Sequence, residues 1–222
     1  MEKFRLRAFF REHVLRQSRQ QIFARMYTRN SWGNVESVSG DGSDLQQTRT
    51  IRRKIATLAK ELGIRTILDA PCGDYHWMQH VPLELDEYVG ADVVPELIEE
   101  NTRLYGSATR RFVVLDICQD ELPTVDLILC RDCLIHLPLQ SATAAVRNFA
   151  RSGSRYLLAT TYPGLVARNK PLVITGNWRP IDLTLPPFSL PAPLRVINEQ
   201  TTYPADFPEK SLGLWALAGA RN

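Results

Sequence analysis

The stretch ILDAPCGDYHWM, residues 67 to 78, decides the fold of this chain. A short apolar run ends on Asp69, meets Pro71, Cys72 and Gly73, and then opens into a segment that we expect to be helical. A strand that turns into a helix in this way is typical of a nucleotide-binding turn. A dinucleotide fingerprint carries three glycines at this place, whereas this turn carries one. The turn therefore does not indicate a nicotinamide-dependent oxidoreductase.

Apolar runs and helical patterns alternate around this stretch. The strand-like runs are residues 66–70, 88–92, 112–116, 126–130 and 155–161, and helical patterns begin at Thr48, Pro95 and Leu139. Short buried strands that alternate with helices predict a parallel sheet built from right-handed βαβ units. The runs 194–199 and 211–219 are expected to complete it as an antiparallel edge. The predicted fold class is α/β, with a doubly wound, mostly parallel seven-stranded sheet and helices on both faces.

Length and composition favour one soluble domain. The chain has 222 residues, of which 44% are hydrophobic and 23% charged, as in an ordinary globular protein. No apolar stretch approaches the roughly 20 residues that span a bilayer, and the N-terminus has no apolar core of the secretory type. We expect a cytoplasmic protein without a membrane span. The sequence leaves its oligomeric state open.

The basic charge is concentrated at the N-terminus. Residues 1–30 hold eight Lys and Arg against Glu2 and Glu12, and the remainder of the chain is slightly acidic. A basic arm can contact nucleic acid or a membrane, although a solvated amphipathic helix is the more common case. We predict a helical arm and closing loop over residues 1–50, a domain over 51–222, and a proline-rich insertion on the substrate side at about 162–193.

Three acids end the first three predicted strands. These are Asp69, Asp92 and Asp116. Because the carboxyl ends of parallel strands share one edge of the sheet, the three carboxylates should converge there. A pyrophosphate would be repelled by them. A ligand with an ammonium group, a ribose diol and an adenine amino group would suit them, because each of these groups donates hydrogen bonds.

S-adenosylmethionine (SAM) is such a ligand, and residues 51–161 resemble the class I SAM-dependent methyltransferases. The resemblance implies that Asp69 and Gly73 hold the methionine end, that Asp92 binds the ribose hydroxyls, and that Asp116 contacts the adenine amino group with Ile117 packed on the ring. Asp92 lies nineteen residues after Gly73, close to the spacing expected of such an acid. The family turn is usually DxGxGxG, so this turn departs from it in having Gly73 alone.

Further cofactor contacts are predicted around this turn. The glycine-rich loop from Trp32 to Thr48 precedes the first strand, where it can close over a cofactor. The additional predicted cofactor residues are Pro71, Asp74, Arg131, Trp32, Ser43 and Thr48.

Catalytic and acceptor residues are expected on the other side of the site. Methyl transfer needs positioning of the nucleophile and exclusion of water, and an oxygen nucleophile also benefits from a base. Asp132 and His136 lie four apart after the fourth strand, so His136 is predicted as base and Asp132 as the group that orients it. The predicted substrate contacts are Tyr75, Trp178 and Arg179.

The predicted function is methyl transfer from SAM to a small-molecule acceptor, at a hydroxyl oxygen of a sugar-like or other hydroxylated compound. Two alternatives stay open: a catalytically silent SAM-binding module, and a nucleic-acid methyltransferase that uses the basic arm. The latter is disfavoured because no NPPY-type sequence follows the fourth strand. Cys130 and Cys133 form a CxxC without a second pair, so we expect buried cysteines and no metal site.

Overall fold

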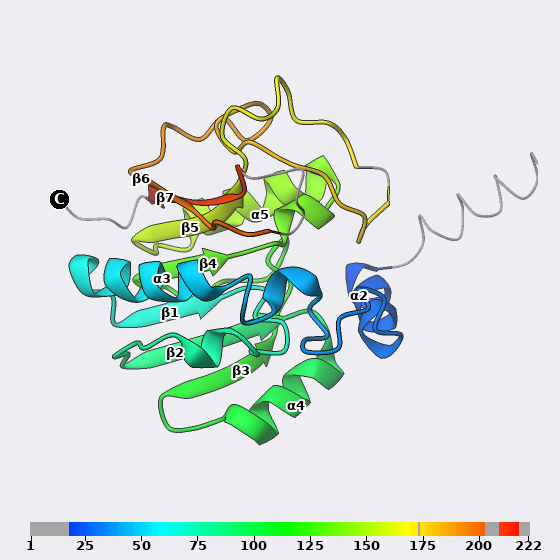
Figure 1. The fold of residues 1–222 in the computed structure, drawn as a ribbon, viewed down its shortest axis with the longest axis vertical. Helices are drawn as coiled ribbons and strands as arrows, with labels where there is room; N and C mark the ends of the chain where they lie inside the picture. Colours follow the sequence, from blue (N-terminus) through cyan, green and yellow to red (C-terminus); the bar gives the residue numbers. More distant parts are fainter. Residues whose placement is uncertain (1–17, 173, 203–208, 218–222) are drawn as a thin grey trace, which may run out of the picture.

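The computed structural model describes residues 18–172, 174–202 and 209–217. Within them lies a seven-stranded sheet in the order β3-β2-β1-β4-β5-β7-β6 (Figure 1). The strands are β1 (Thr66–Asp69), β2 (Glu87–Asp92), β3 (Arg110–Val114), β4 (Leu127–Cys130), β5 (Tyr156–Thr161), β6 (Arg195–Asn198) and β7 (Ser211–Ala216). β7 runs antiparallel to β5 and β6, and the other neighbouring strands are parallel. The predicted fold class, including its antiparallel edge, is confirmed.

The predicted helices also form. They are α3 (Arg49–Leu62), α4 (Pro95–Tyr105) and α5 (Leu139–Arg151). α3 ends at Gly63, whose φ of 62° lies in the left-handed region that glycine adopts without strain. Another helix, α2 (Arg19–Thr28), begins with a capping box between Ser18 and Gln21.

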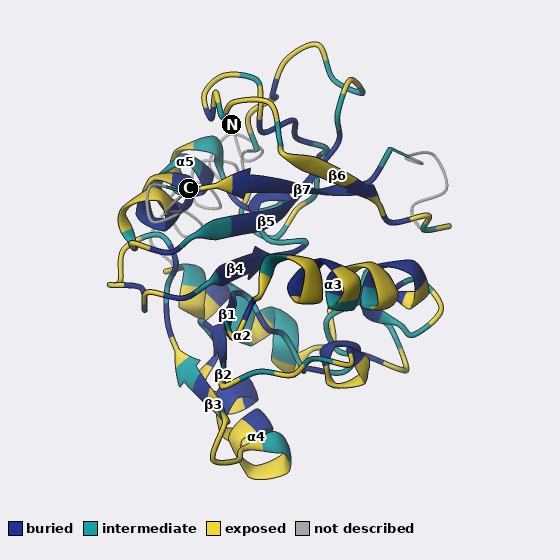
Figure 2. Cartoon of the chain, turned by 90° about the vertical axis from the view of Figure 1, so that its left-hand side faces the viewer, coloured by how far each residue is buried: buried dark blue, intermediate teal, exposed yellow. Residues whose placement is uncertain are grey.

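The core has two layers, one on each face of the sheet. On one face α3 buries Ile51 and Ile55 in the cluster that contains Ile67, and on the other face α5 buries Phe149 in the cluster that contains Leu68. Neighbouring residues of β1 thus serve opposite faces, as the alternation of a strand requires. Each large apolar side chain buried in this way contributes about 1.5–3 kcal/mol. In Figure 2 the central strands are buried and lie between helices whose outer sides are exposed, whereas β6 at the edge is mostly exposed.

The order of strands reverses beside β1, which pairs with β2 on one side and β4 on the other. In open sheets of this kind, ligands bind outside the carboxyl ends of the strands at such a switch point. Figure 1 shows α2 at this end of the sheet. The topology therefore places the site between the ends of β1 to β5 and α2.

The segment after Gly73 differs from the prediction, because it forms turns and the short 3-10 helix η2 (Met78–His80) and no α-helix. Tyr75 has a φ of 57°, which a right-handed helix does not allow. Its ring packs against those of Tyr88, Tyr105 and Phe112 at centroid distances of 5.1–5.3 Å. This aromatic packing fixes the segment as a compact crossover.

The proline-rich insertion at 162–193 is irregular but well anchored. Ile181 and Leu183 are fully buried. The side chain of Asn169 donates to the carbonyl oxygen of Asp182 (2.8 Å) and accepts from its backbone N–H (2.9 Å). The insertion is therefore a fixed wall beside the end of β5. The predicted division at residue 50 stays a prediction, and residues 1–17 of the predicted arm lie outside the described residues.

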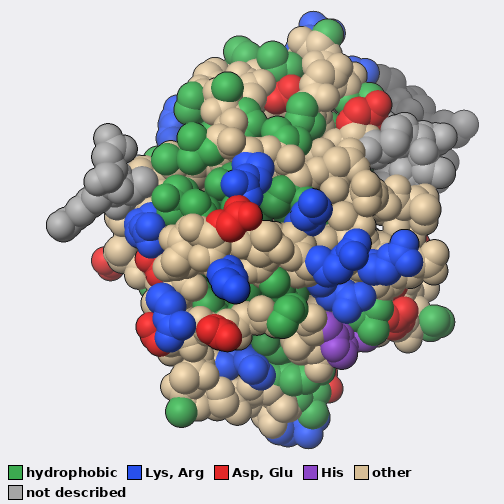
Figure 3. Space-filling view, turned by 60° about the vertical axis from the view of Figure 1, so that its left-hand side comes forward, with side chains coloured by type: hydrophobic (Ala, Val, Ile, Leu, Met, Phe, Trp, Pro, Cys, Tyr) green, Lys and Arg blue, Asp and Glu red, His purple; other side chains and the backbone are tan. Residues whose placement is uncertain are grey.

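The exposed side of α3 carries Arg49, Arg53, Lys54 and Lys60. Lys and Arg side chains are spread over the face drawn in Figure 3, with acidic side chains among them. Within the described ranges, no helix has the length and apolar character needed to cross a membrane.

Candidate functional site

A cavity of about 440 Å³ lies at the carboxyl ends of the parallel strands. Its walls come from the ends of β1 to β4, from α2 and the loop after it, and from the proline-rich insertion. Of the predicted cofactor residues, those that line it are Trp32, Ser43, Asp69, Pro71, Gly73, Asp92, Asp116, Ile117 and Arg131. The predicted residues Asp132, His136 and Trp178 line it as well. Most of the residues that the sequence predicted for the site therefore lie around one cavity in the structure.

Asp69 ends β1 and is almost fully buried. Its Oδ2 accepts a hydrogen bond from the Tyr88 hydroxyl (2.6 Å), whereas its buried Oδ1 has no partner among the described residues. Burial raises the pKa of this carboxyl from 3.8 to about 7. A buried acceptor without a partner is costly, so Oδ1 is suited to receive a donor from a ligand.

Asp92 ends β2 and is also buried. Its Oδ1 accepts a hydrogen bond from the backbone N–H of Val94 (3.1 Å), the residue that precedes α4. Burial raises the pKa of Asp92 from 3.8 to about 6. The two neighbouring strands thus present two buried carboxyls to the same cavity.

Gly73 allows a close approach at the turn after β1. Its φ is 52°, and a Cβ added there would lie 2.2 Å from the Oγ of Ser39. Its carbonyl oxygen accepts a hydrogen bond from the side chain of Asn101 in α4 (2.7 Å). A larger residue at position 73 would therefore require the Ser39 side chain to move.

The Asp74 prediction requires correction, because its carboxylate holds the closing loop and does not line the cavity. It accepts hydrogen bonds from the Ser37 hydroxyl (2.8 Å), the Val38 backbone N–H (3.0 Å) and the Ser39 hydroxyl (3.1 Å). Ser39 and Val38 line the cavity in its place. Asp74 therefore acts on the site through the loop.

Asp116 lies two residues beyond the end of β3 and lines the cavity. Its carboxylate is paired with Arg19 of α2, whose Nε and terminal nitrogen lie 3.0 and 2.6 Å from Oδ2. Its Oδ1 accepts the backbone N–H of Cys118 (2.9 Å). The acid predicted for the adenine end is thus already engaged with α2.

A buried charge cluster lies beside the end of β4 and consists of Arg131, Asp132, Glu199 and Lys210. Arg131 pairs with Glu199 at 2.7 Å, and Lys210 pairs with Asp132 at 2.6 Å and with Glu199 at 3.6 Å. Arg131 also donates to the carbonyl oxygen of Gly42 (2.7 Å). The cluster thereby ties the C-terminal hairpin and the closing loop to the end of β4.

The predicted pairing of Asp132 with His136 is wrong. Asp132 pairs with Lys210 and Arg131 and accepts from the Thr160 hydroxyl, and no hydrogen bond joins it to His136 in the described structure. Nδ1 of His136 lies 3.0 Å from the carbonyl oxygen of Asn177. Because a carbonyl only accepts, Nδ1 carries the proton and Nε2 keeps a lone pair. The backbone of the insertion therefore orients His136.

Burial lowers the pKa of His136 below 6.5, although Asp132 opposes the shift. The imidazole is consequently neutral at physiological pH. It lies in the 3-10 helix η3 (Leu134–His136) directly after β4. A neutral imidazole with a lone pair at the cavity wall can accept a proton.

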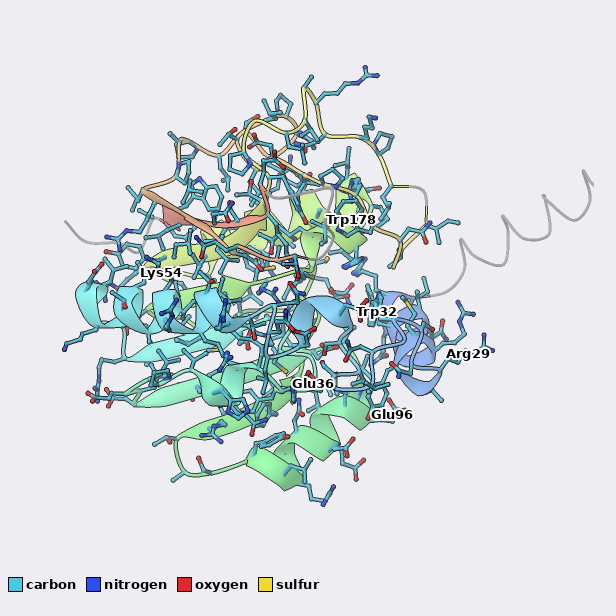
Figure 4. All side chains as sticks on the ribbon, in the orientation of Figure 1. Arg29, Trp32, Glu36, Lys54, Glu96 and Trp178 are labelled. Carbon is cyan, nitrogen blue, oxygen red and sulfur yellow. The ribbon has the colours of Figure 1, made fainter. Side chains whose placement is uncertain are left out.

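Aromatic side chains form the wall around His136. The Trp32 ring lies 5.9 Å from the imidazole, and Trp178 packs edge to face on Tyr162 at 6.1 Å. Figure 4 labels Trp32 in the loop after α2 and Trp178 in the insertion, both at the end of the sheet where α2 lies. This half of the cavity is suited to a planar or ring-shaped molecule.

Three further predictions require correction, because these side chains do not line the cavity. Tyr75 is buried in the aromatic crossover described above. Arg179 donates to the carbonyl oxygens of Lys170 (2.7 Å) and Ile135 (3.0 Å), so it fastens the insertion. Thr48 is fully buried and donates to Asp44 in the turn before α3.

Sequence reasoning missed several residues of the site, namely Arg19, Tyr162, Lys210 and the buried Glu199 behind it. Each is brought in by tertiary packing. Tyr162 alone had a usable signal, because it comes directly after β5 and so lies at the carboxyl end of a strand, as Asp69 does at the end of β1. The four cysteines are free. Burial raises the pKa of Cys72, whereas a hydrogen bond with the side chain of Cys130, followed by burial, raises the pKa of Cys133.

No family model and no curated protein matches the chain. Among solved structures it is similar to the methyltransferase domain of bacterial CtHen1, with 14% identity over 53% of this chain and 66% of that chain and a TM-score of 0.46. It is also similar to magnesium protoporphyrin IX methyltransferase from Synechocystis PCC 6803 with bound SAM (17% identity, 69% and 81% covered, TM-score 0.48). A third is the N-methyltransferase NodS from Bradyrhizobium japonicum (15%, 62% and 73%, TM-score 0.46).

The chain spans between 49% and 66% of the lengths of the first three matched chains. The residues of the cavity therefore provide the evidence for a function.

Proposed function

We propose that this chain is a SAM-dependent methyltransferase that methylates a hydroxyl oxygen of a small-molecule acceptor. The observation that carries the proposal is the pair of buried carboxyls, Asp69 and Asp92, at one cavity beside the switch point. Oδ1 of Asp69 lacks a partner among the described residues. The charge of Arg131 acts on Asp69, but neither Asp69 nor Asp92 forms an ion pair within the described residues. Buried acids that lack an ion-pair partner favour a ligand rich in hydrogen-bond donors or carrying positive charge.

The residues of the cavity fit SAM. Asp69 and the Gly73 turn would hold the methionine end, since Oδ1 can accept from an ammonium group. Asp92 would accept from the ribose hydroxyls, and Ile117 would pack on the adenine. Asp116 would share its carboxylate between the adenine amino group and Arg19, so that α2 closes this end of the site.

SAM would supply a methyl group on a sulfonium, which passes to the acceptor oxygen as the sulfur–carbon bond breaks and a neutral thioether leaves. The chain's own part is to position the acceptor and to exclude water. Trp32, Trp178 and Tyr162 cover the acceptor side. Nε2 of His136 takes the hydroxyl proton as the oxygen–carbon bond forms.

Calorimetric titration with SAM and its demethylated product, S-adenosylhomocysteine, tests the proposal. Asp92→Ala should weaken SAM binding at least about tenfold, because charge-assisted hydrogen bonds contribute roughly 1.5–3 kcal/mol. Asp86→Ala is the matched control, because Asp86 is an exposed acid paired with Arg65, just before β2. Binding of neither compound to the wild-type chain, or equal binding by a folded Asp92→Ala variant, would overturn the cofactor assignment. Binding without methylation of any acceptor would indicate a silent module.

A further inference from the structure

One member of the charge cluster, Asp132, has a more exposed side chain than the other three. The Asp132 side chain is 22% exposed, whereas those of Arg131, Lys210 and Glu199 are 4%, 3% and 0% exposed. Arg131 and Lys210 are both paired with Asp132 and Glu199. Arg131 also donates a hydrogen bond to the carbonyl oxygen of Gly42. The cluster is therefore neutral as a whole, and Asp132 is the acid that it presents to a molecule bound in the cavity.

Elsewhere in the cavity, too, the described residues provide no unpaired cation for an anionic ligand. The described lining contains five acids and three cations: Asp41, Asp69, Asp92, Asp116 and Asp132 against Arg19, Arg131 and Lys210. The third cation, Arg19, is paired with Asp116 at the other end. His136 is neutral because burial lowers its pKa. An anionic group near His136 would thus meet the Asp132 carboxylate without a free cation from the described residues.

Much of the remaining wall around His136 is apolar or aromatic, and the closing loop adds Asp41 and Ser43 beside it. Trp32 and Trp178 approach from the closing loop and the insertion, and Ile135 and Leu137 flank His136. Aromatic faces bind rings by stacking and edge contacts. A carboxylate such as Asp132 accepts hydrogen bonds from hydroxyl groups.

We propose, on the basis of the function proposed above, that the acceptor is an uncharged ring compound that carries hydroxyl groups. Carboxylated, phosphorylated and nucleotide-linked relatives of it are rejected by the Asp132 carboxylate. The acceptor's reacting hydroxyl faces Nε2 of His136, and its ring lies against the tryptophans. Asp132 is thus a specificity-determining residue.

Matched pairs of probe compounds test this inference. The three pairs are 4-methylphenol against 4-hydroxybenzoate, methyl glucoside against glucose 6-phosphate, and methyl glucoside against UDP-glucose. Binding is measured by calorimetry with and without S-adenosylhomocysteine, and methylation with radiolabelled SAM. The uncharged member of at least one pair should bind or react at least about tenfold better than its anionic partner, because an anion entering the cavity loses its hydration and meets a carboxylate whose two cations are already paired.

Two variants should shift this preference in opposite directions. Asp132→Asn leaves Glu199 as the one acid for two cations, so it should narrow or reverse the preference. Lys210→Met leaves Asp132 less neutralised, so it should widen it. Asp86→Asn removes one exposed acid outside the cavity and should leave the ratio of the two affinities unchanged.

Equal or tighter binding of the anionic members to the wild-type chain would overturn the inference, and so would a panel in which no uncharged ring compound binds or reacts. The wild-type comparison needs no variant, so a variant that fails to fold does not remove the test. Failure of SAM itself to bind would instead refute the proposed function, because the charge preference is also measured without cofactor.

Discussion

Glu199→Gln should destabilise the fold strongly, because this side chain is fully buried and contacts two buried cations. In the native cluster two acids balance two cations. The substitution leaves Asp132 alone with Arg131 and Lys210, so one positive charge stays buried without an acid. Breaking a buried ion pair from one side costs about 3–5 kcal/mol. The glutamine oxygen can still accept from Arg131, so we expect a loss near the lower end, about 3 kcal/mol.

Urea unfolding followed by tryptophan fluorescence measures this loss. With a denaturant slope of about 1–3 kcal/mol/M, the midpoint should fall by roughly 1 M or more. Glu61→Gln is the matched control, because Glu61 pairs with Arg195 of β6 but both side chains are about half exposed, at 47% and 48%. Exposed pairs contribute at most about 1 kcal/mol. A Glu199→Gln loss no larger than that of the control would refute the reasoning that the cluster anchors the C-terminal hairpin.

Three further predictions concern the cavity. Asp69 binds a proton more readily in the folded chain (pKa about 7 against 3.8), so its contribution to stability falls as the pH rises from about 4 to 7. In urea unfolding, the free energy of unfolding of Asp69→Asn should not show this fall with pH. A difference in unfolding free energy between wild type and variant that does not vary with pH would contradict the prediction. Asp74→Ala should release the loop at Ser37, seen as faster amide hydrogen exchange at Val38 and weaker SAM binding, and unchanged exchange would show that the loop is held otherwise. His136→Ala should lower turnover by roughly 10²- to 10⁴-fold with SAM affinity nearly intact and with a defect that shrinks at high pH; normal turnover on the acceptor would make this histidine structural.

The sequence predicted the sheet and its acids because both depend on local patterns. The run that ends at Asp69 and the helix that stops at Gly63 are read from periodicity and from the conformational freedom of glycine. The parallel register then brings Asp69 and Asp92 together without further information, since adjacent parallel strands end at the same edge.

The remainder of the site depends on contacts between residues far apart in the chain. Arg131 meets Glu199 across 68 positions, and Arg19 meets Asp116 across 97. No local pattern marks such pairs. Tyr75 was misassigned for a related reason, because its left-handed backbone and its aromatic neighbours turn it into the core.

The crystal structure of the chain with S-adenosylhomocysteine bound tests the central claim most directly. The account predicts that the ribose hydroxyls lie within hydrogen-bond distance of Asp92 and that the amino group of the methionine portion contacts Oδ1 of Asp69. The adenine should lie beside Ile117, with α2 closed over it. A nucleoside bound elsewhere, or bound in this cavity with Asp69 and Asp92 both more than 4 Å from any of its donors, would contradict the account.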